Sequence, residues 1–134
     1  MRRAPNIAES VTTRIGSASG TATGRKESIV TLEISVLLRD MLLAEGATVV
    51  MTRDTQKTFV GMLERAYIPN EANADFVLRL HCNSGNEWAQ GIQIYCPSDS
   101  SYAQEVADLE TYRAMGNTLL SAMKAATGKT RGGC

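Results

Sequence analysis

Residues 27–54 read ESIVTLEISVLLRDMLLAEGATVVMTRD, a helix pattern followed at once by a strand pattern. Four apolar residues recur at helical spacing, namely Val30, Ile34, Leu37 and Met41. This period predicts a helix that begins at Glu27 and runs for roughly five turns. Gly46 supplies its stop, and the β-rich segment from Ala47 to Thr52 predicts a short buried strand.

The chain continues with the same alternation of helix and strand. A second helix is predicted over residues 61–73, and the run FVLRLH predicts a second strand from Phe76 to His81. Strand, helix and strand within about 35 residues form a βαβ unit, whose strands lie parallel with a right-handed crossover. Ile92 to Cys96 predicts a third strand, and Ala103 to Thr127 a long final helix. The fold class is therefore α/β, with a mostly parallel sheet flanked by helices.

The two ends of the chain lack such patterns. Residues 1–26 are rich in Ser, Thr, Gly and Ala without a sustained helical or strand period, so we predict a long loop there. Residues 27–127 then make up the α/β core, and residues 128–134 a tail. A length of 134 residues with 43% hydrophobic and 21% charged residues agrees with one domain over residues 1–134.

Composition also narrows the class of partner. Fourteen basic and fourteen acidic residues give a formal net charge of zero, which removes the long-range field that draws proteins onto nucleic acid or anionic lipid. We therefore predict no nucleic-acid partner. Because no apolar run approaches the roughly 18 residues of a membrane span, we predict no membrane insertion. The first residues also lack the apolar segment of a secretory signal.

Several common site motifs do not occur in this sequence. The three cysteines, Cys82, Cys96 and Cys134, are odd in number and widely spaced, so they predict neither a disulfide framework nor a CxxC metal site. We expect two buried small side chains and one thiol in the tail. The run GTATGRK has the wrong spacing for a P-loop, and no GxSxG nucleophile motif is present.

Two residues remain as candidates for chemistry. His81 is the single histidine of the chain and ends a predicted strand, where ligands gather in open α/β sheets. Glu27 opens the first predicted helix, a place that the helix dipole favours for a carboxylate even without function. Taken alone, His81 is as readily structural as functional, and for Glu27 the structural role is the commoner one. Taken together, they are ligand types of catalytic Zn²⁺ sites, and we expect their donor atoms to converge within roughly 6 Å.

The order of these motifs resembles the catalytic domain of zinc-dependent N-acetylmuramoyl-L-alanine amidases of the amidase type 3 family. In that family a glutamate opens the first helix, and an LxxxGxxVxxTR segment follows. An R-(x)₄-N-(x)₄-D motif then leads into a strand that ends in His-x-Asn. The matching residues are Glu27, Leu42 to Arg53, Arg65, Asn70, Asp75, His81 and Asn83.

The resemblance implies a single twisted, mostly parallel sheet flanked by helices and incomplete relative to the family. It implies a bacterial peptidoglycan hydrolase, of the autolysin kind, that cleaves the amide between N-acetylmuramic acid and L-alanine with zinc-activated water. In the family a first histidine, a glutamate and a second histidine hold Zn²⁺; Glu27 and His81 match the last two. Asn83 and Arg65 match positions that bind substrate or support the ligands.

Two family residues have no counterpart in the chain. The first histidine follows an initial strand, which we expect upstream of Met1, and the general-base glutamate is expected beyond Cys134. The chain would then be a partial catalytic domain without a catalytic base, with little activity alone. The partner would be peptidoglycan, and the location extracellular, at the cell wall, or phage-delivered. The alternatives left open are a non-catalytic cell-wall-binding remnant of such an amidase and a plain α/β interaction domain.

Overall fold

The computed structural model describes residues 6–11, 18–58, 60–86, 88–97 and 108–129. The chain divides into two compact units, Met1–Ser84 and Gly85–Cys134, and each is described by itself. The described elements of the first unit follow the order β1, α1, β2, α2, β3, and the second unit contains the helix α4.

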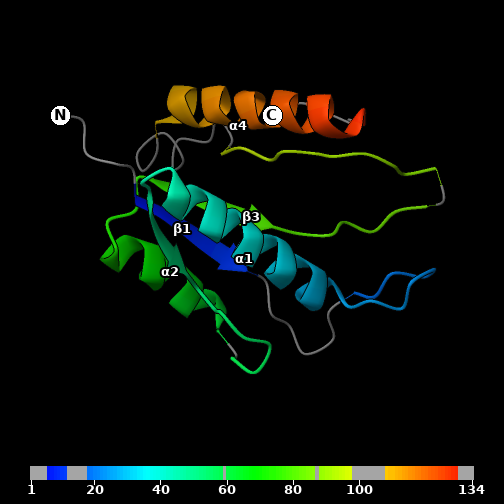
Figure 1. The fold of residues 1–134 in the computed structure, drawn as a ribbon, viewed down its shortest axis with the longest axis horizontal. Coiled ribbons are helices and arrows are strands. Elements are labelled where there is room, and N and C mark those ends of the chain that lie inside the picture. Colours follow the sequence, from blue (N-terminus) through cyan, green and yellow to red (C-terminus); the bar gives the residue numbers. More distant parts are fainter. Residues whose placement is uncertain (1–5, 12–17, 59, 87, 98–107, 130–134) are drawn as a thin grey trace. The chain divides into compact units, whose positions relative to one another are not determined.

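The strands of the first unit form one parallel sheet in the order β2-β1-β3 (Figure 1). The central strand is β1 (Asn6–Val11), which pairs on one side with β2 (Thr48–Met51) and on the other with β3 (Phe76–Leu80). The α/β class is therefore confirmed. Since both outer strands run parallel to β1, they also run parallel to each other, as the βαβ pattern predicts.

The central strand corrects two expectations. Residues 1–26 are not all loop, because β1 occupies Asn6–Val11, and a strand that precedes the first helix lies within the chain rather than upstream of Met1. The segment NIAESV does not have a clear strand pattern, because it is short and mixes polar with small residues. Pairing along both of its edges makes it a strand, and such pairing leaves no mark in a local sequence pattern.

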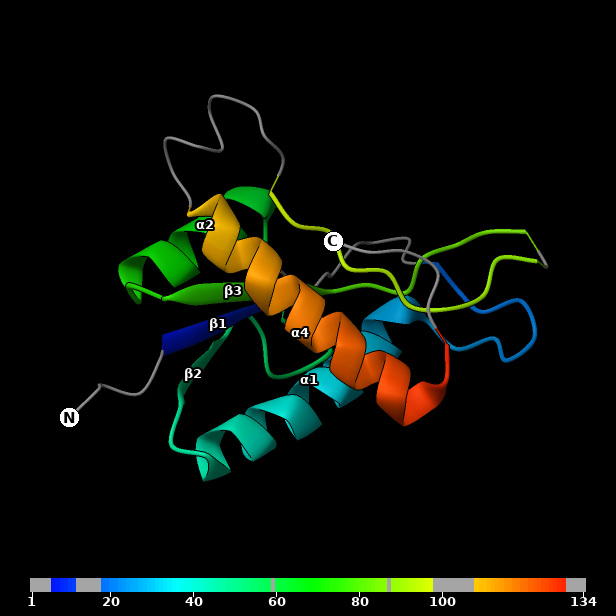
Figure 2. The same ribbon diagram turned by 90° about the horizontal axis from the view of Figure 1, so that it is seen from above.

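The helices α1 (Glu27–Ala44) and α2 (Met62–Glu71) lie on opposite faces of this sheet (Figure 2). The chain moves outward from β1 to β2 through α1 and returns past β1 to β3 through α2. Right-handed crossovers that run in opposite directions place their helices on opposite faces. The carboxyl ends of β1 and β3 therefore point to the same edge as the N-terminus of α1 (Figure 1).

Small polar side chains make up most of the buried face of α1, where Ser28, Thr31 and Ser35 lie beside a single buried leucine, Leu32. Thr31 and Ser35 are fully buried, and each hydroxyl donates to the carbonyl four residues earlier: Thr31 Oγ1 to Glu27 at 2.9 Å and Ser35 Oγ to Thr31 at 2.7 Å. These bonds satisfy the hydroxyls inside the packed layer. Three members of the apolar stripe that identifies the helix remain exposed, namely Ile34, Leu37 and Met41.

The end of α1 depends on a glycine, as the sequence predicts. Gly46 has a φ of +85°, and its amide donates to the carbonyl of Leu43 at 3.0 Å. We expect Gly46→Ala to lower the free energy of unfolding by about 1 to 2 kcal/mol, because a Cβ strains this left-handed conformation. Nothing lies within 4 Å of the position that a Cβ would take, so the cost is conformational.

Urea unfolding of the two proteins measures this difference, and Gly46→Asn serves as the matched control. Asparagine tolerates the left-handed region better than alanine does, so it should retain part of the lost stability. An alanine variant as stable as the parent would contradict this account of the helix end.

The second unit departs from the sequence expectations in one place. Ile92 to Cys96 is not a strand, and no strand pairing in the described part of the chain includes it. An alternating segment becomes a strand only where another strand pairs with it. The final helix α4 (Leu109–Thr127) is confirmed over its described length, while residues 103–107 of the predicted helix lie outside the described residues. Asp108 caps α4 by accepting from Thr111 N at 3.2 Å.

The cysteines also differ from expectation. Cys82 is exposed and carries a free thiol, and Cys96 is joined in a disulfide bond, so neither is a buried small apolar residue. Cys82 is exposed because it lies beyond the last paired residue of β3, where the sheet ends. Among the described helices, none has the length and apolar character that crossing a membrane requires.

Candidate metal centre

Glu27 and His81 meet at the carboxyl edge of the sheet. Glu27 Oε1 lies 3.0 Å from His81 Nδ1, although the two residues are 54 positions apart in the chain. Glu27 is the first residue of α1, and His81 directly follows the last residue of β3. The expectation that an acid at a helix start and an imidazole at a strand end converge is therefore confirmed.

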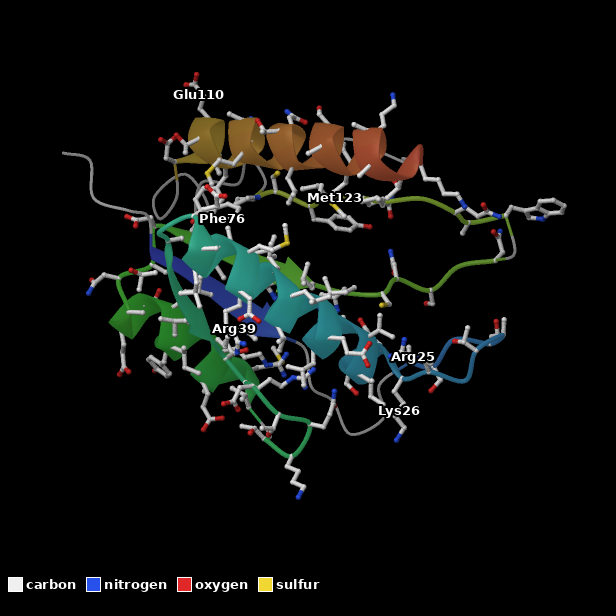
Figure 3. The ribbon with its side chains drawn as sticks, viewed as in Figure 1. Arg25, Lys26, Arg39, Phe76, Glu110 and Met123 are labelled. Carbon is white, nitrogen blue, oxygen red and sulfur yellow. The ribbon has the colours of Figure 1, made fainter. Side chains whose placement is uncertain are left out.

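A short turn holds the start of α1 in place. Ser19 bridges to Lys26 in antiparallel fashion, and the amide of Glu27 donates to the carbonyl of Ala18 at 2.8 Å. Arg25, labelled beside the first turn of α1 in Figure 3, forms an ion pair with Glu33 at 2.6 Å. The backbone of Glu27 is thus tied to the preceding segment before the helix begins.

The carboxylate of Glu27 also bonds to the backbone after β3. Cys82 N donates to Glu27 Oε1 at 2.9 Å, so a single oxygen atom contacts both the imidazole and an amide. The side chain of Glu27 is 12% exposed and that of His81 is 46% exposed. The acid is therefore well enclosed, while the imidazole faces solvent.

Cys82 does not add a nucleophile to this pair. Partial desolvation of the thiol group, and then the negative charge of Glu27, raise the pKa of the Cys82 thiol above its usual value, although the residue as a whole is exposed. The thiolate, and not the thiol, is the nucleophile and the metal ligand. This direction favours the neutral thiol at Cys82.

The geometry of the pair suits two ligands of one Zn²⁺ ion. Bonds of about 2.0 to 2.1 Å in a tetrahedral arrangement leave two donor atoms about 3.3 Å apart, close to the 3.0 Å between Glu27 Oε1 and His81 Nδ1. Within the part of the chain that the structure describes, no group of three or more His, Cys, Asp or Glu side chains is arranged to hold a metal ion. The described residues therefore fit two positions of a coordination sphere.

The other predicted site residues make local contacts. Arg65 lies in the first turns of α2, and its Nε donates to the carbonyl of Val60 at 3.2 Å. Asn83 is exposed two residues after His81, and its Oδ1 accepts from the amide of Ser84 at 3.1 Å. Asn83 thus shares the edge with the pair, and Arg65 Nε bonds to the segment just before α2.

Sequence reasoning missed two residues that reach the start of α1. Arg53 is 2% exposed, and its Nη2 donates to the carbonyl of Ser28 at 2.6 Å. Gln56 Nε2 donates to the same carbonyl at 2.9 Å. For Arg53, the sequence offered one signal: it is the arginine of the Thr-Arg pair that ends the LxxxGxxVxxTR segment, directly after a predicted buried strand.

The fold and the site together define an α/β domain with a candidate metal centre at the carboxyl edge of its parallel sheet. Residues 12–133 match the family Amidase_3, described as N-acetylmuramoyl-L-alanine amidase. The chain belongs to this family. No curated protein matches the chain.

Solved structures of amidases share this fold. The CwlD amidase from Clostridioides difficile, in complex with the GerS lipoprotein, has a TM-score of 0.72 at 17% identity over 95% of this chain and 68% of its own. An N-acetylmuramoyl-L-alanine amidase from Clostridium difficile has a TM-score of 0.70 at 20% identity over 90% of this chain and 64% of its own.

A third similar structure is Cwp6 from Clostridium difficile, with a TM-score of 0.59 at 28% identity. The match covers 67% of this chain and 14% of Cwp6. The chain thus spans from 14% to 68% of the length of these three structures.

Proposed function

We propose that this chain belongs to a peptidoglycan hydrolase that cleaves the amide between N-acetylmuramic acid and the L-alanine of the stem peptide. The observation that carries the proposal is the 3.0 Å approach of Glu27 to His81 in a chain of the amidase family. Zn²⁺ is the proposed cofactor, with Glu27 and His81 as two of its ligands. The proposed place of work is the bacterial cell wall, outside the cell.

Zn²⁺, when bound, would polarise the scissile carbonyl and make a water molecule acidic enough to attack it. The residues of this chain orient the ligands. The amide of Cys82 holds Glu27 Oε1 in place, because a carboxylate that accepts a backbone hydrogen bond keeps a defined direction. Asn83, exposed on the same edge, is proposed to donate a hydrogen bond to the substrate. Arg65 is proposed to bind the substrate or to support the metal ligands.

A second candidate function is a wall-binding domain without catalysis, and one observation favours it. In the family the first histidine follows the initial strand, and here the residues that follow β1 read TTRIGSASG, without histidine. The lack of this ligand is therefore a property of the sequence after β1 and does not come from a missing strand. A site with fewer ligands would lose the metal, while the domain could still bind peptidoglycan.

A digest of purified peptidoglycan by the full-length protein tests both candidates. An amidase yields stem peptides with a free L-alanine amino group and glycan strands that retain their lactyl groups, and a chelator should stop their release. Mass spectrometry of the products identifies the bond that is cut. A protein that sediments with the cell wall, releases no peptide and still binds in the presence of a chelator would favour the binding domain over the amidase.

A further inference from the structure

We infer that Arg53 and Gln56 are positioning residues for Glu27, acting through the first turn of α1. The inference rests on the proposed function in one respect, because it takes Glu27 to be a metal ligand. Its structural part, the control of where the Glu27 carboxylate lies, stands on hydrogen bonds in the first unit alone.

The segment that follows β2 closes on the first turn of α1 with two separate donors. Arg53 Nη2 and Gln56 Nε2 both reach the carbonyl of Ser28, at 2.6 Å and 2.9 Å. Arg53 Nη1 also donates to the carbonyl of Thr55 at 3.3 Å, which ties the guanidinium to its own loop. Ser28 is itself buried and is the immediate neighbour of Glu27.

Helix stability does not explain this arrangement. The start of a helix has unsatisfied amide donors, so a cap must be an acceptor, whereas Arg53 and Gln56 offer donors to a carbonyl. A cation beside the positive end of the helix dipole is also unfavourable. Enclosing the charge of Arg53 adds a desolvation cost. What these contacts do supply is a fixed position for the turn that carries Glu27.

The position of this turn matters because the Glu27 carboxylate must lie within hydrogen-bond distance of two separate groups. Its Oε1 sits 3.0 Å from His81 Nδ1 and 2.9 Å from Cys82 N. A displacement of the first turn by roughly 1 Å would bring the first distance to about 4 Å, beyond hydrogen-bond range and too far for two ligands of one Zn²⁺. The turn before α1 restrains Glu27 from one side, and Arg53 with Gln56 restrain it from the β2 side.

The single histidine of the chain provides a direct test. The ¹⁵N resonance of His81 Nδ1 reports its hydrogen bond to Glu27 at fixed pH without any metal, and Glu27→Ala defines the resonance of the ring without this bond. We expect Gln56→Leu to move the parent resonance part of the way toward that position, and Gln56→Lys, which keeps a donor of similar reach, to move it less. Arg53→Lys, which leaves one donor group in place of a fork, should also move it.

Arg39→Gln is the matched control, because Arg39 lies about three turns along the same helix and pairs with Asp40. It should leave the His81 resonance unchanged. On the Glu27→Ala background, Gln56→Leu and Arg53→Lys should produce no further movement. Zn²⁺ affinity of the full-length protein should fall by roughly 10- to 100-fold in Gln56→Leu, as for other groups that orient a metal ligand.

The inference is overturned if the Gln56→Leu protein folds and its His81 resonance equals that of the parent. It is also overturned if Gln56→Leu moves the His81 resonance equally in the parent and in the Glu27→Ala background. If Arg53→Lys fails to fold, Gln56→Leu still decides, because Gln56 is an exposed residue. The resonance does not depend on catalysis. A protein that cleaves no peptidoglycan can therefore still support the positioning role, and an active amidase can still refute it.

Discussion

Replacing Glu27 or His81 with alanine in the full-length protein is expected to abolish the release of stem peptides from peptidoglycan. Each replacement removes a proposed Zn²⁺ ligand, and even residues that only orient a ligand affect metal affinity by about 10- to 100-fold. Zn²⁺ affinity should therefore fall by at least that factor, as measured by competition with a chromogenic chelator. Peptide release is followed by mass spectrometry in the same preparations.

Arg39→Gln is again the control, since it changes an exposed ion pair on α1 away from the candidate centre. The chain of 134 residues alone is expected to bind Zn²⁺ poorly and to release little peptide. Two ligands hold a metal weakly, and among the described residues no third His, Cys, Asp or Glu side chain joins the pair. If the alanine variants cleave as well as the parent, the amidase proposal fails.

Robust cleavage by the 134 residues alone would require another ligand or base from within the chain. Glu64 is already engaged elsewhere, because its Oε2 accepts from the amide of Gly61 at 2.7 Å at the start of α2. Glu9 lies on the central strand β1. A Glu9→Gln variant of such an active chain would then identify or exclude this carboxylate.

Ser35→Leu is expected to lower the free energy of unfolding by about 1 to 3 kcal/mol, or more if the sheet cannot adjust. Ser35 is 0% exposed and lies on the face of α1 that packs on the sheet, so the larger side chain has no space. Urea unfolding measures the loss. This is a counter-intuitive result for a helix, because leucine has the higher helix propensity of the two.

Two companion variants separate packing from hydrogen bonding. Ser35→Ala removes the bond to the carbonyl of Thr31 but fits the space, and its effect should stay within about 1 kcal/mol. Leu37→Ser, on the exposed stripe of the same helix, should change stability by roughly 0.5 kcal/mol or less. A Ser35→Leu protein as stable as the parent would show that this face is not packed against the sheet.

Local sequence patterns predict much of the secondary structure of the first unit. The helical period after Glu27, the glycine stop at Gly46 and the two β-rich runs each concern residues within one element, and the elements found there agree with them. The spaced motifs around Glu27 and His81 also indicate the family and the pair that meets at the sheet edge. These features depend on short-range geometry, which periodicity reports directly.

Tertiary structure alone decided the remaining features. The strand Asn6–Val11 owes its existence to neighbours that come more than 30 residues later, and Ile92 to Cys96 has no such pairing among the described residues. α1 buries small polar residues such as Ser35 and leaves Leu37 exposed, because the close approach of the sheet selects a face by size as well as by hydrophobicity. The donors that reach Ser28 come from a loop 25 and 28 positions away. Such contacts join separate segments, and no local sequence period records which segments will meet.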